Sequence, residues 1–469
     1  MRHGRRAALV LLATLALGSA SCSRSGYDTE TSATTAAPSD TSGGPEGTTG
    51  DGSTTTTVAT NRLDAGSFGD LDNVCHDGDA SGATDVGVTD DSIQVGTITD
   101  KGFSARPGLD EEMYDAAVAF AAWCNEHGGI DGRELVVADR DAALADYNAR
   151  IVESCSEDFA IVGGGAVLDD ADNGGRVACG LPSIPGYVVS AAAREADLQV
   201  QPLPNPVDTL QAGQYQEIAA QFPDLIGHYG TITSQFGSVL LVRDTSVAAA
   251  TAEGFTDVYD REYNSQGESN WRPFVEELQS AGVQVLEFIG EPTFFGQLLE
   301  AMDAVGYHPE LAIEPPNFYD TTFVENSGSL AGFVHIRSQF TPFELADENP
   351  ATADYLELMQ RYNPDGKVAL LGAQALSAFL LFAQSATECG SELTRTCLLE
   401  KAGSVTEWTG GGLHAPQDPS TGTPSPCFTI LDVSADGFTV NTDLTNPTDG
   451  DGIFNCEDDN LVTVDVPSN

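Results

Sequence analysis

Basic residues are scarce in this sequence. Its 469 residues include 20 lysines and arginines against 71 aspartates and glutamates, which gives a formal net charge of −51 at pH 7. Lysine itself occurs only as Lys101, Lys367 and Lys401. A surface of this kind repels the phosphates of nucleic acids and of anionic lipids. The composition therefore argues against nucleic acid as a partner and suits a protein that faces the outside of the cell.

Motifs of catalysis and metal binding are also missing. No two cysteines have the CxxC spacing of a zinc or redox site, and the histidines form no HExxH motif. Neither a Gly-x-Ser-x-Gly elbow nor a P-loop is present. Residues 77–88 begin like a calcium loop, but Val88 stands where that loop needs a glutamate. We therefore predict that the protein is not an enzyme and uses no cofactor and no metal ion.

Apolar runs long enough for a transmembrane helix are absent after the N-terminus. At the N-terminus three arginines precede an apolar run over residues 7–17, which has the layout of a secretory signal. We predict that residues 1–22 are a lipoprotein-type signal peptide and that Cys22 is lipidated. The lipid anchor would hold the protein on the outer face of the cytoplasmic membrane. Because Ser19 stands where such signals usually have leucine, a secreted or periplasmic protein with unmodified Cys22 is the alternative.

Residues 23–85 offer little from which a core can form. The part up to residue 61 is rich in serine, threonine, glycine and proline, and its one aromatic residue is Tyr27. Such a composition does not offset the entropy lost on ordering the chain. An acidic segment follows up to residue 85. We predict that this whole region is disordered and serves as a tether.

The first folded unit is expected between residues 93 and 139. Apolar residues alternate over residues 93–98 and recur at helical spacing over residues 113–124. A glycine pair at 128–129 ends this helix, and residues 134–139 have the pattern of a second strand. Strand, helix and strand in this order predict a parallel sheet. Open parallel sheets bind ligands beyond the carboxyl ends of their strands.

The alternation of strands and helices continues in two halves. The second half is expected to begin with a strand over residues 239–242, ended by Arg243 and Asp244. Crossovers between the halves are expected near Pro206 and Phe333. We predict an α/β protein with two Rossmann-like lobes, whose parallel-rich sheets are joined by crossover strands. Lobe 1 comprises residues 86–206 and 334–407, and lobe 2 comprises residues 207–333 and 408–466.

Residues 125–133, with the sequence Asn-Glu-His-Gly-Gly-Ile-Asp-Gly-Arg, resemble the "N..GGI.G" signature of the branched-chain-amino-acid-type substrate-binding proteins of ABC transporters. Further matches, in the same order and spacing, bring the similarity to about residues 88–440; they lie at 162–164, 290–292, 306–309, 339–343 and 349–350. The resemblance implies the type I periplasmic-binding fold and a role in amino acid transport. It further implies that a monomer captures a small-molecule ligand between two closing lobes and delivers it to a permease.

The resemblance also implies that the ligand binds at two strand-exit loops, where the family tends to have serine or threonine hydroxyls. The corresponding residues here are Gly164, Gly165 and Ala166 in one loop and Gly186 and Tyr187 in the other. A simple branched-chain amino acid is therefore not expected. A small uncharged ligand, weakly polar or carrying an aromatic ring, fits better. The glycine loop offers backbone N–H groups to such a ligand, or else is only a tight turn.

Other candidate ligand-binding residues also follow expected strands. Phe103, Phe318 and Tyr319 are aromatic residues on exit loops, which suits stacking on a ligand; the alternative is that they cap the core of a lobe. Asp244 and Glu291 offer carboxylates to a ligand amine, or cap the next helix.

The eight cysteines after Cys22 imply four disulfides in an exported chain. Resemblance to the amino-acid binders pairs Cys155, at the end of a helix, with Cys179, before a strand. Sequence proximity pairs Cys389 with Cys397 and Cys427 with Cys456, which leaves Cys75 with Cys124.

Two further functions stay open. A module of the same fold can sense a ligand and signal to a partner protein, and a secreted hydrolase without a recognised motif is the third possibility. A permease gene beside this one would favour transport, a sensor-kinase gene would favour sensing, and turnover of a substrate would favour hydrolysis.

Overall fold

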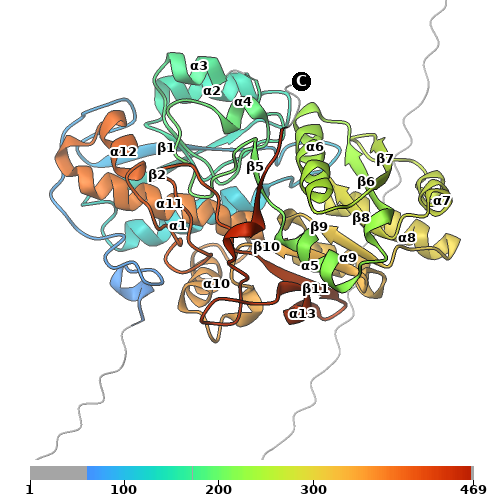
Figure 1. Ribbon diagram of the computed structural model, residues 1–469. Helices are drawn as coiled ribbons and strands as arrows, with labels where there is room; N and C mark the ends of the chain where they lie inside the picture. Colours follow the sequence, from blue (N-terminus) through green and yellow to red (C-terminus); the bar gives the residue numbers. More distant parts are fainter. Residues whose placement is uncertain (1–60, 172, 466–469) are drawn as a thin grey trace, which may run out of the picture. The chain divides into compact units, whose positions relative to one another are not determined.

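The computed structural model describes residues 61–171 and 173–465. Within this part of the chain two α/β lobes can be followed in Figure 1, each built around one mainly parallel sheet. The predicted fold class is therefore confirmed. The signal peptide, Cys22 and the first part of the tether lie outside the described residues, so the roles predicted for them stay predictions.

The sheet of lobe 1 has four parallel strands in the order β2-β1-β3-β4. Ile93 and Val95 of β1 are fully buried, and Val95 lies opposite Val137 of β2. Helix α1 (Glu111–Glu126) connects these two strands, which confirms the predicted strand-helix-strand unit. The strand bounds are β1 (Ser92–Thr99), β2 (Glu134–Asp141), β3 (Ile161–Val162) and β4 (Ser183–Ile184).

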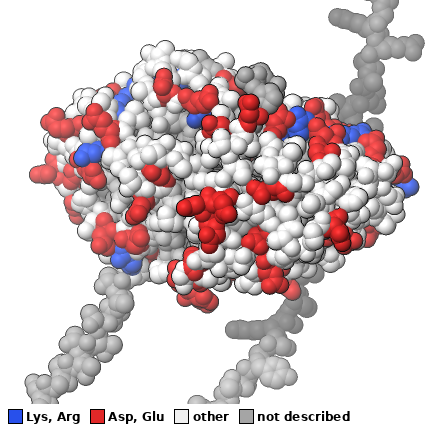
Figure 2. All heavy atoms as spheres, in the orientation of Figure 1, with Lys and Arg blue, Asp and Glu red and all other residues white. Residues whose placement is uncertain are grey.

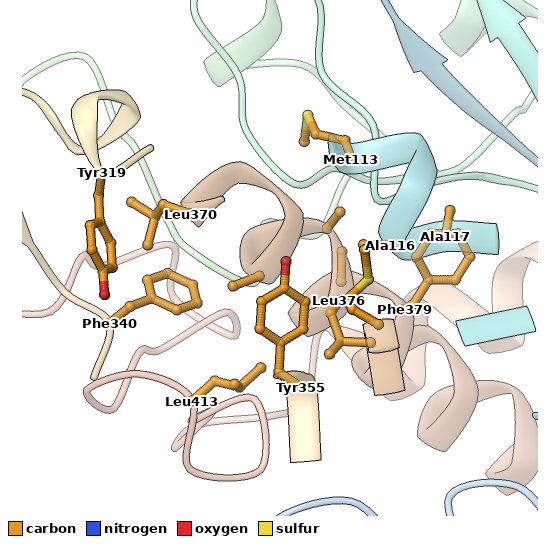
Figure 3. Close-up of a cluster of buried hydrophobic side chains, with 14 of the residues drawn as sticks. Met113, Ala116, Ala117, Tyr319, Phe340, Tyr355, Leu370, Leu376, Phe379 and Leu413 are labelled. Atoms are coloured by element: carbon orange, nitrogen blue, oxygen red, sulfur yellow. The ribbon is translucent and has the colours of Figure 1, made fainter. Parts of the chain in front are cut away.

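Helix α11 (Leu370–Cys389) is the centre of lobe 1. It packs against α1, α12, β3 and β4, and Figure 3 shows Leu376 and Phe379 of α11 beside Ala116 and Ala117 of α1. In the described chain, α11 is the one helix long and apolar enough to cross a membrane, but 78% of its apolar window is buried inside the lobe. It is therefore a core helix. The other helices of lobe 1 are α2 (Tyr147–Glu157), α3 (Asn173–Ala178), α4 (Ala191–Arg194), α10 (Pro350–Tyr362) and α12 (Arg395–Ala402).

The sheet of lobe 2 has seven strands in the order β12-β11-β10-β9-β8-β6-β7. The strands from β10 to β7 are parallel, and β11 and β12 add an antiparallel edge. Their bounds are β6 (Tyr229–Ser234), β7 (Asp257–Tyr263), β8 (Val285–Ile289), β9 (Leu311–Glu314), β10 (Val334–Ser338), β11 (Thr429–Ser434) and β12 (Gly437–Val440).

The helices of lobe 2 are α5 (Gly213–Gln221), α6 (Gly237–Ala252), α7 (Arg272–Ala281), α8 (Pro292–Val305), α9 (Thr321–Ser327) and α13 (Thr442–Thr445). Short 3-10 helices in the two lobes cover Leu63–Ala65, Ile226–His228, Pro316–Phe318, Gly328–Ala331, Phe343–Leu345, Gly390–Glu392 and Asp458–Asn460.

The strand expected at residues 239–242 is wrong, because these residues belong to helix α6. The strand that precedes them is β6, in which every residue is buried. A short apolar run is compatible with both a strand and a helix. The alanine-rich sequence that follows has a high helix propensity and continues the helix through residue 252. Asp244 therefore lies within a helix and not at the end of a strand.

Two of the predicted lobe boundaries differ from the way the strands and loops pair in the structure. Strand β5 (Thr209–Gln211) follows the crossover expected near Pro206 and pairs with β13 (Leu461–Thr463). Strand β10 pairs with β9 and β11, so the boundary predicted before residue 334 falls one strand too early.

The second difference concerns the loop after residue 407, which was assigned to lobe 2. Trp408 Nε1 lies 2.9 Å and His414 Nε2 lies 2.8 Å from the hydroxyl oxygen of Ser377 on α11. The start of this loop therefore packs on lobe 1, because these two rings supply hydrogen-bond partners for a buried hydroxyl.

Residues 61–85 are packed on lobe 1, so the prediction that the whole region 23–85 is disordered is wrong for this part. Leu63 and Phe68 are fully buried, and the carbonyl of Leu63 accepts a hydrogen bond from Trp123 Nε1 at 2.9 Å. A disulfide joins Cys75 to Cys124 of α1. A few bulky side chains and one covalent link therefore order a segment whose average composition is polar.

The four predicted disulfides are all confirmed. They are Cys75–Cys124, Cys155–Cys179, Cys389–Cys397 and Cys427–Cys456. Closing these loops restricts the unfolded chain, so each disulfide stabilises the fold by about 2–4 kcal/mol.

The face shown in Figure 2 carries many acidic side chains and few basic ones. This distribution agrees with the formal charge of −51.

Candidate functional site

A cavity of about 350 Å³ opens between the strand-exit loops of the two lobes. This volume is many times what one water molecule occupies by the same measure, and it is within the range of ligand sites in proteins. Its walls come from the carboxyl ends of β1 and β4 in lobe 1 and of β6, β8 and β9 in lobe 2. The main side chains there are Phe103, Arg106, Asp110, Glu112 and Tyr187 from lobe 1 and Phe236, Tyr263, Ile289, Glu291 and Asn317 from lobe 2.

Asp110 lies at the lobe 1 wall, directly before α1. Its backbone is left-handed (φ 58°), a conformation that aspartate tolerates better than most residues. Its carboxylate accepts a hydrogen bond from the Tyr187 hydroxyl at 2.7 Å. Burial, aided by the charges of Asp100 and Glu291, raises the pKa of Asp110 well above its usual range. Asp110 and Tyr187 thus form a fixed polar pair that can donate or accept a ligand hydrogen bond.

An ion pair crosses the cavity from Arg106 of lobe 1 to Glu291 of lobe 2, with Nε and Oε2 3.5 Å apart. A quarter of the Glu291 side chain is exposed, towards the cavity. Burial raises the pKa of Glu291 to about 7, although Arg106 opposes this rise. Glu291 therefore changes its charge near neutral pH, at the position where the lobes meet.

A second cation links the lobes beside this pair. Lys367 Nζ lies 3.2 Å from Glu112 Oε2 of α1 and 2.8 Å from Asp320 Oδ2 of lobe 2. Burial lowers the pKa of Lys367, but Glu112 and Asp320 outweigh it and raise that pKa. Burial in turn raises the pKa of Glu112. One lysine thus holds two buried carboxylates from different lobes.

Four buried polar atoms on residues of the cavity wall have no hydrogen-bond partner within the described chain. They are Nε of Arg106, Nη1 of Arg194, Oε1 of Gln214 and Oε1 of Gln374. Buried polar atoms are nearly always hydrogen-bonded in native proteins, and an unpaired one costs about 1–3 kcal/mol. The wall therefore presents two donors and two acceptors that suit a polar group inside the cavity.

The structure brings together four of the predicted ligand-binding residues. Phe103, Gly186, Tyr187 and Glu291 all line the large cavity. Gly164, Gly165 and Ala166 line a separate cavity of about 30 Å³, which Tyr187 also borders. A Cβ atom at Gly165 would lie 2.5 Å from the Tyr187 ring, so glycine at this position lets the tyrosine ring pack closely.

Three predicted residues lie away from the cavity wall. Phe318 is fully buried and packs against Phe295 and Phe323 in the core of lobe 2. The hydroxyl of Tyr319 donates a hydrogen bond to Glu344, and Figure 3 shows Tyr319 among core side chains. Asp244 accepts hydrogen bonds from Arg243 on α6. For both aromatic residues, the core-capping alternative describes their position.

Most polar side chains of the wall were not among the predicted site residues. Several of them lie within helices or strands and not after a strand, namely Glu287 in β8, Arg337 in β10, Arg194 in α4 and Gln214 in α5. Glu287 interrupts the apolar sequence Val-Leu-Glu-Phe-Ile, and this interruption was the available signal. Others lie in loops, namely Arg106, Asp110 and Lys367.

Comparison with known proteins shows what this chain is similar to. The family model described as "Periplasmic binding protein" matches residues 205–438, about half of the chain. No curated protein matches the chain.

Many solved structures are similar in fold. A fatty acid ABC transporter substrate-binding protein from Thermomonospora curvata is 16% identical, with a TM-score of 0.64 over 77% of this chain and 95% of that one. A solute-binding protein from Rhodopseudomonas palustris BisB5, in complex with 3,4-dihydroxybenzoic acid, is 15% identical, with a TM-score of 0.62 over 80% and 98%. A leucine-binding protein from Thermotoga maritima is 12% identical, with a TM-score of 0.60 over 74% and 97%.

The chain thus has the fold of the type I periplasmic-binding proteins, as predicted. The predicted resemblance to branched-chain-amino-acid-type substrate-binding proteins of ABC transporters is also confirmed by the family match and these neighbours. These relatives are binding proteins and not enzymes, which agrees with the prediction of no catalytic activity.

Proposed function

We propose that this protein captures a small organic ligand between its two lobes outside the cytoplasm and delivers it to an ABC permease. The observation that supports this most is the cavity between the strand-exit loops, crossed by the Arg106–Glu291 and Lys367–Asp320 ion pairs. These pairs form only when the lobes approach each other. Lobe closure that depends on a ligand is the usual basis of capture and release in two-lobed proteins.

The ligand is proposed to differ from a simple branched-chain amino acid. The loops after β3 and β4 have glycine, alanine and tyrosine where hydroxyls would hold an α-amino acid. The structurally similar proteins include one named for fatty acids, one bound to a dihydroxybenzoate and one named for leucine, so this fold accepts several ligand classes. The arginines at the cavity wall favour a ligand with an acidic or acceptor group over a wholly uncharged one.

Export and anchoring complete the proposal. Four disulfides are typical of proteins that fold in an oxidising compartment. We propose that the monomer is held at the outer face of the cytoplasmic membrane by lipid on Cys22. Mass spectrometry of the protein from the membrane fraction should detect the added lipid mass on Cys22. Replacing Cys22 with serine should release the protein into the medium.

A ligand panel tests capture itself. Amino acids, amides, aromatic acids and fatty acids should be screened by thermal shift, with X-ray scattering to detect compaction. A true ligand raises the melting temperature by mass action and compacts the molecule. Tyr187→Ala should weaken this effect, whereas Phe222→Ala, at an exposed site outside the cavity wall, should not. Selective stabilisation by leucine that is undiminished in Tyr187→Ala would contradict the altered ligand, and no stabilisation by any class would contradict capture.

A further inference from the structure

The cavity does not end at the exit loops but continues into lobe 2 beneath helix α6. Its wall includes Val242, Thr245 and Ala249, which lie successively further along this helix. It also includes Glu287, the middle residue of β8, and Tyr215 of α5. These residues belong to the interior of a lobe and not to its strand-exit edge. We call this part, between α6 and the sheet, the inner compartment.

The apolar residues of helix α6 that line the inner compartment are not all covered by other side chains. Val239 and Val242 are only partly buried, whereas Thr245 and Ala249 are buried. Partly buried valines beside Leu210 and Ile289 give the compartment an apolar side. Such a surface gains about 25 cal/mol for each Å² that a hydrocarbon covers.

At its polar end the inner compartment holds the positively charged side chain of Arg337, which forms no ion pair within the described residues. Arg337 donates from Nη1 to Gln211 Oε1 at 2.7 Å. The nearby Glu287 already accepts hydrogen bonds from Tyr215 (2.8 Å), Tyr229 (2.6 Å) and Ser246 (2.9 Å). Burial lowers the pKa of Arg337, although Tyr215 and Glu287 oppose this. Arg337 stays charged, so a buried guanidinium faces the cavity without a carboxylate of its own.

An unpartnered acceptor lies in the same compartment. Gln214 is 4% exposed, its Nε2 donates to the carbonyl of Gln211, and its Oε1 has no partner. Exchanging Oε1 and Nε2 of Gln214 would place its amide oxygen against the carbonyl oxygen of Gln211, and the two would repel each other. The carbonyl therefore fixes which amide atom of Gln214 is the oxygen. The compartment therefore offers a cation for an anion and an acceptor for a hydroxyl or a bound water.

We propose that the inner compartment binds the carboxylate of a monocarboxylic acid at Arg337, with the hydrocarbon part of the ligand lying along α6 towards the cleft. This assignment rests on the proposed capture function and specifies its ligand class. Arginine suits the task because its planar guanidinium binds both oxygens of a carboxylate. The valines of α6 supply the apolar contact for the hydrocarbon.

Titration calorimetry on the purified full chain tests this with matched ligands. Hexanoate, octanoate and decanoate should each bind about tenfold or more tightly than the corresponding primary amides, since a hydrogen bond to a charged group is the stronger kind. Arg337→Gln should remove this preference while leaving amide binding nearly unchanged. Arg106→Gln removes the ion pair with Glu291 at the cleft and so should weaken acids and amides alike, but it should keep the preference for acids. Val242→Trp, which fills the compartment from α6, should weaken the acids about tenfold or more without involving Arg337.

The outcomes separate the two proposals. If acids bind and Arg106→Gln removes the preference while Arg337→Gln does not, the carboxylate lies in the cleft and the inner compartment is not its site. If only ligands of another class bind, with closure of the lobes, the inner compartment assignment is overturned and capture stands. If a circular dichroism spectrum shows that Arg337→Gln is unfolded, Val242→Trp decides, and unchanged acid binding in that variant overturns the assignment.

Discussion

Helices α11 and α6 are both apolar, and each covers the sheet of its lobe, yet they are packed very differently. Fifteen of the 20 residues of α11 are buried, against four of the 16 residues of α6. Lobe 1 uses its helix to close a continuous core with α1, as Figure 3 shows. Lobe 2 leaves the apolar side of its helix towards a cavity. The same kind of sequence thus closes a core in one lobe and lines a cavity in the other.

The largest expected effect compares one truncation in each helix. Phe379→Ala in α11 removes a fully buried ring that contacts Phe120, and we expect the free energy of unfolding to fall by about 4 kcal/mol. Val242→Ala in α6 removes a side chain that already borders a cavity, so we expect a loss below about 1 kcal/mol. Urea denaturation without ligand measures both values. Equal losses would show that α6 is packed as tightly as α11.

The next effect concerns the contact between the lobes. Lys367→Met leaves Glu112 and Asp320 facing each other without a cation, and we expect a loss of about 3 kcal/mol at pH 7. The loss should shrink at pH 5, because burial raises the pKa of Glu112 and the variant can take up a proton there. Lys401→Met is the matched control. Its pair with Glu388 is exposed, so the change should stay within about 0.5 kcal/mol, and an equal effect of the two variants would contradict the structural role of Lys367.

Features of the fold that depend on residues close together in the sequence could be predicted from the sequence. The strand-helix-strand unit around α1 follows from apolar spacing, and the four disulfides follow from proximity and family resemblance. Helix α6 was misread because four apolar residues fit either structure, and only the later alanines decide. Residues 61–85 were misread because Leu63 and Phe68 are ordered by partners distant in sequence, such as Trp123.

The residues of the candidate site likewise divide into those that could be predicted from local sequence and those that depend on packing between distant segments. Phe103, Tyr187 and Glu291 were predictable because residues after parallel strands meet at one edge of a sheet. Phe318 follows a strand as well, but its ring turns back into the core, which only the packing of Phe295 and Phe323 decides. Arg337 lies inside strand β10, and whether an interior strand residue faces a cavity depends on how tightly the neighbouring elements pack.

A smaller effect sharpens the comparison of the two helices with one identical change. Ala375 of α11 is fully buried close to Gly186, so Ala375→Val should overpack lobe 1 and cost about 2 kcal/mol. Ala249→Val adds the same two methyl groups beside the cavity, so its cost should stay near the helix-propensity difference of about 0.5 kcal/mol. Thermal unfolding of the two variants gives both values. The contrast between the lobes would be wrong if Ala249→Val were the more damaging change.

The smallest expected effect lies at Glu291, where the lobes meet. Burial raises the pKa of Glu291 to about 7 from an ordinary value of 4.5, so the folded protein binds this proton more tightly than the unfolded chain does. The contribution of Glu291 to stability is therefore greatest below about pH 4.5 and falls as the pH rises towards 7. Glu291→Gln removes this titration, so the variant should lose about 1 kcal/mol less than the parent between these pH values, after allowing for screening at a site that faces the cavity.

The neutral amide of this variant also cannot form an ion pair with Arg106, and Arg106→Gln in the parent background measures that separate loss. Chemical denaturation across the pH range compares the profiles, and a parent profile identical to that of Glu291→Gln would mean that Glu291 titrates as an exposed carboxylate and that the cleft is open to solvent at this point.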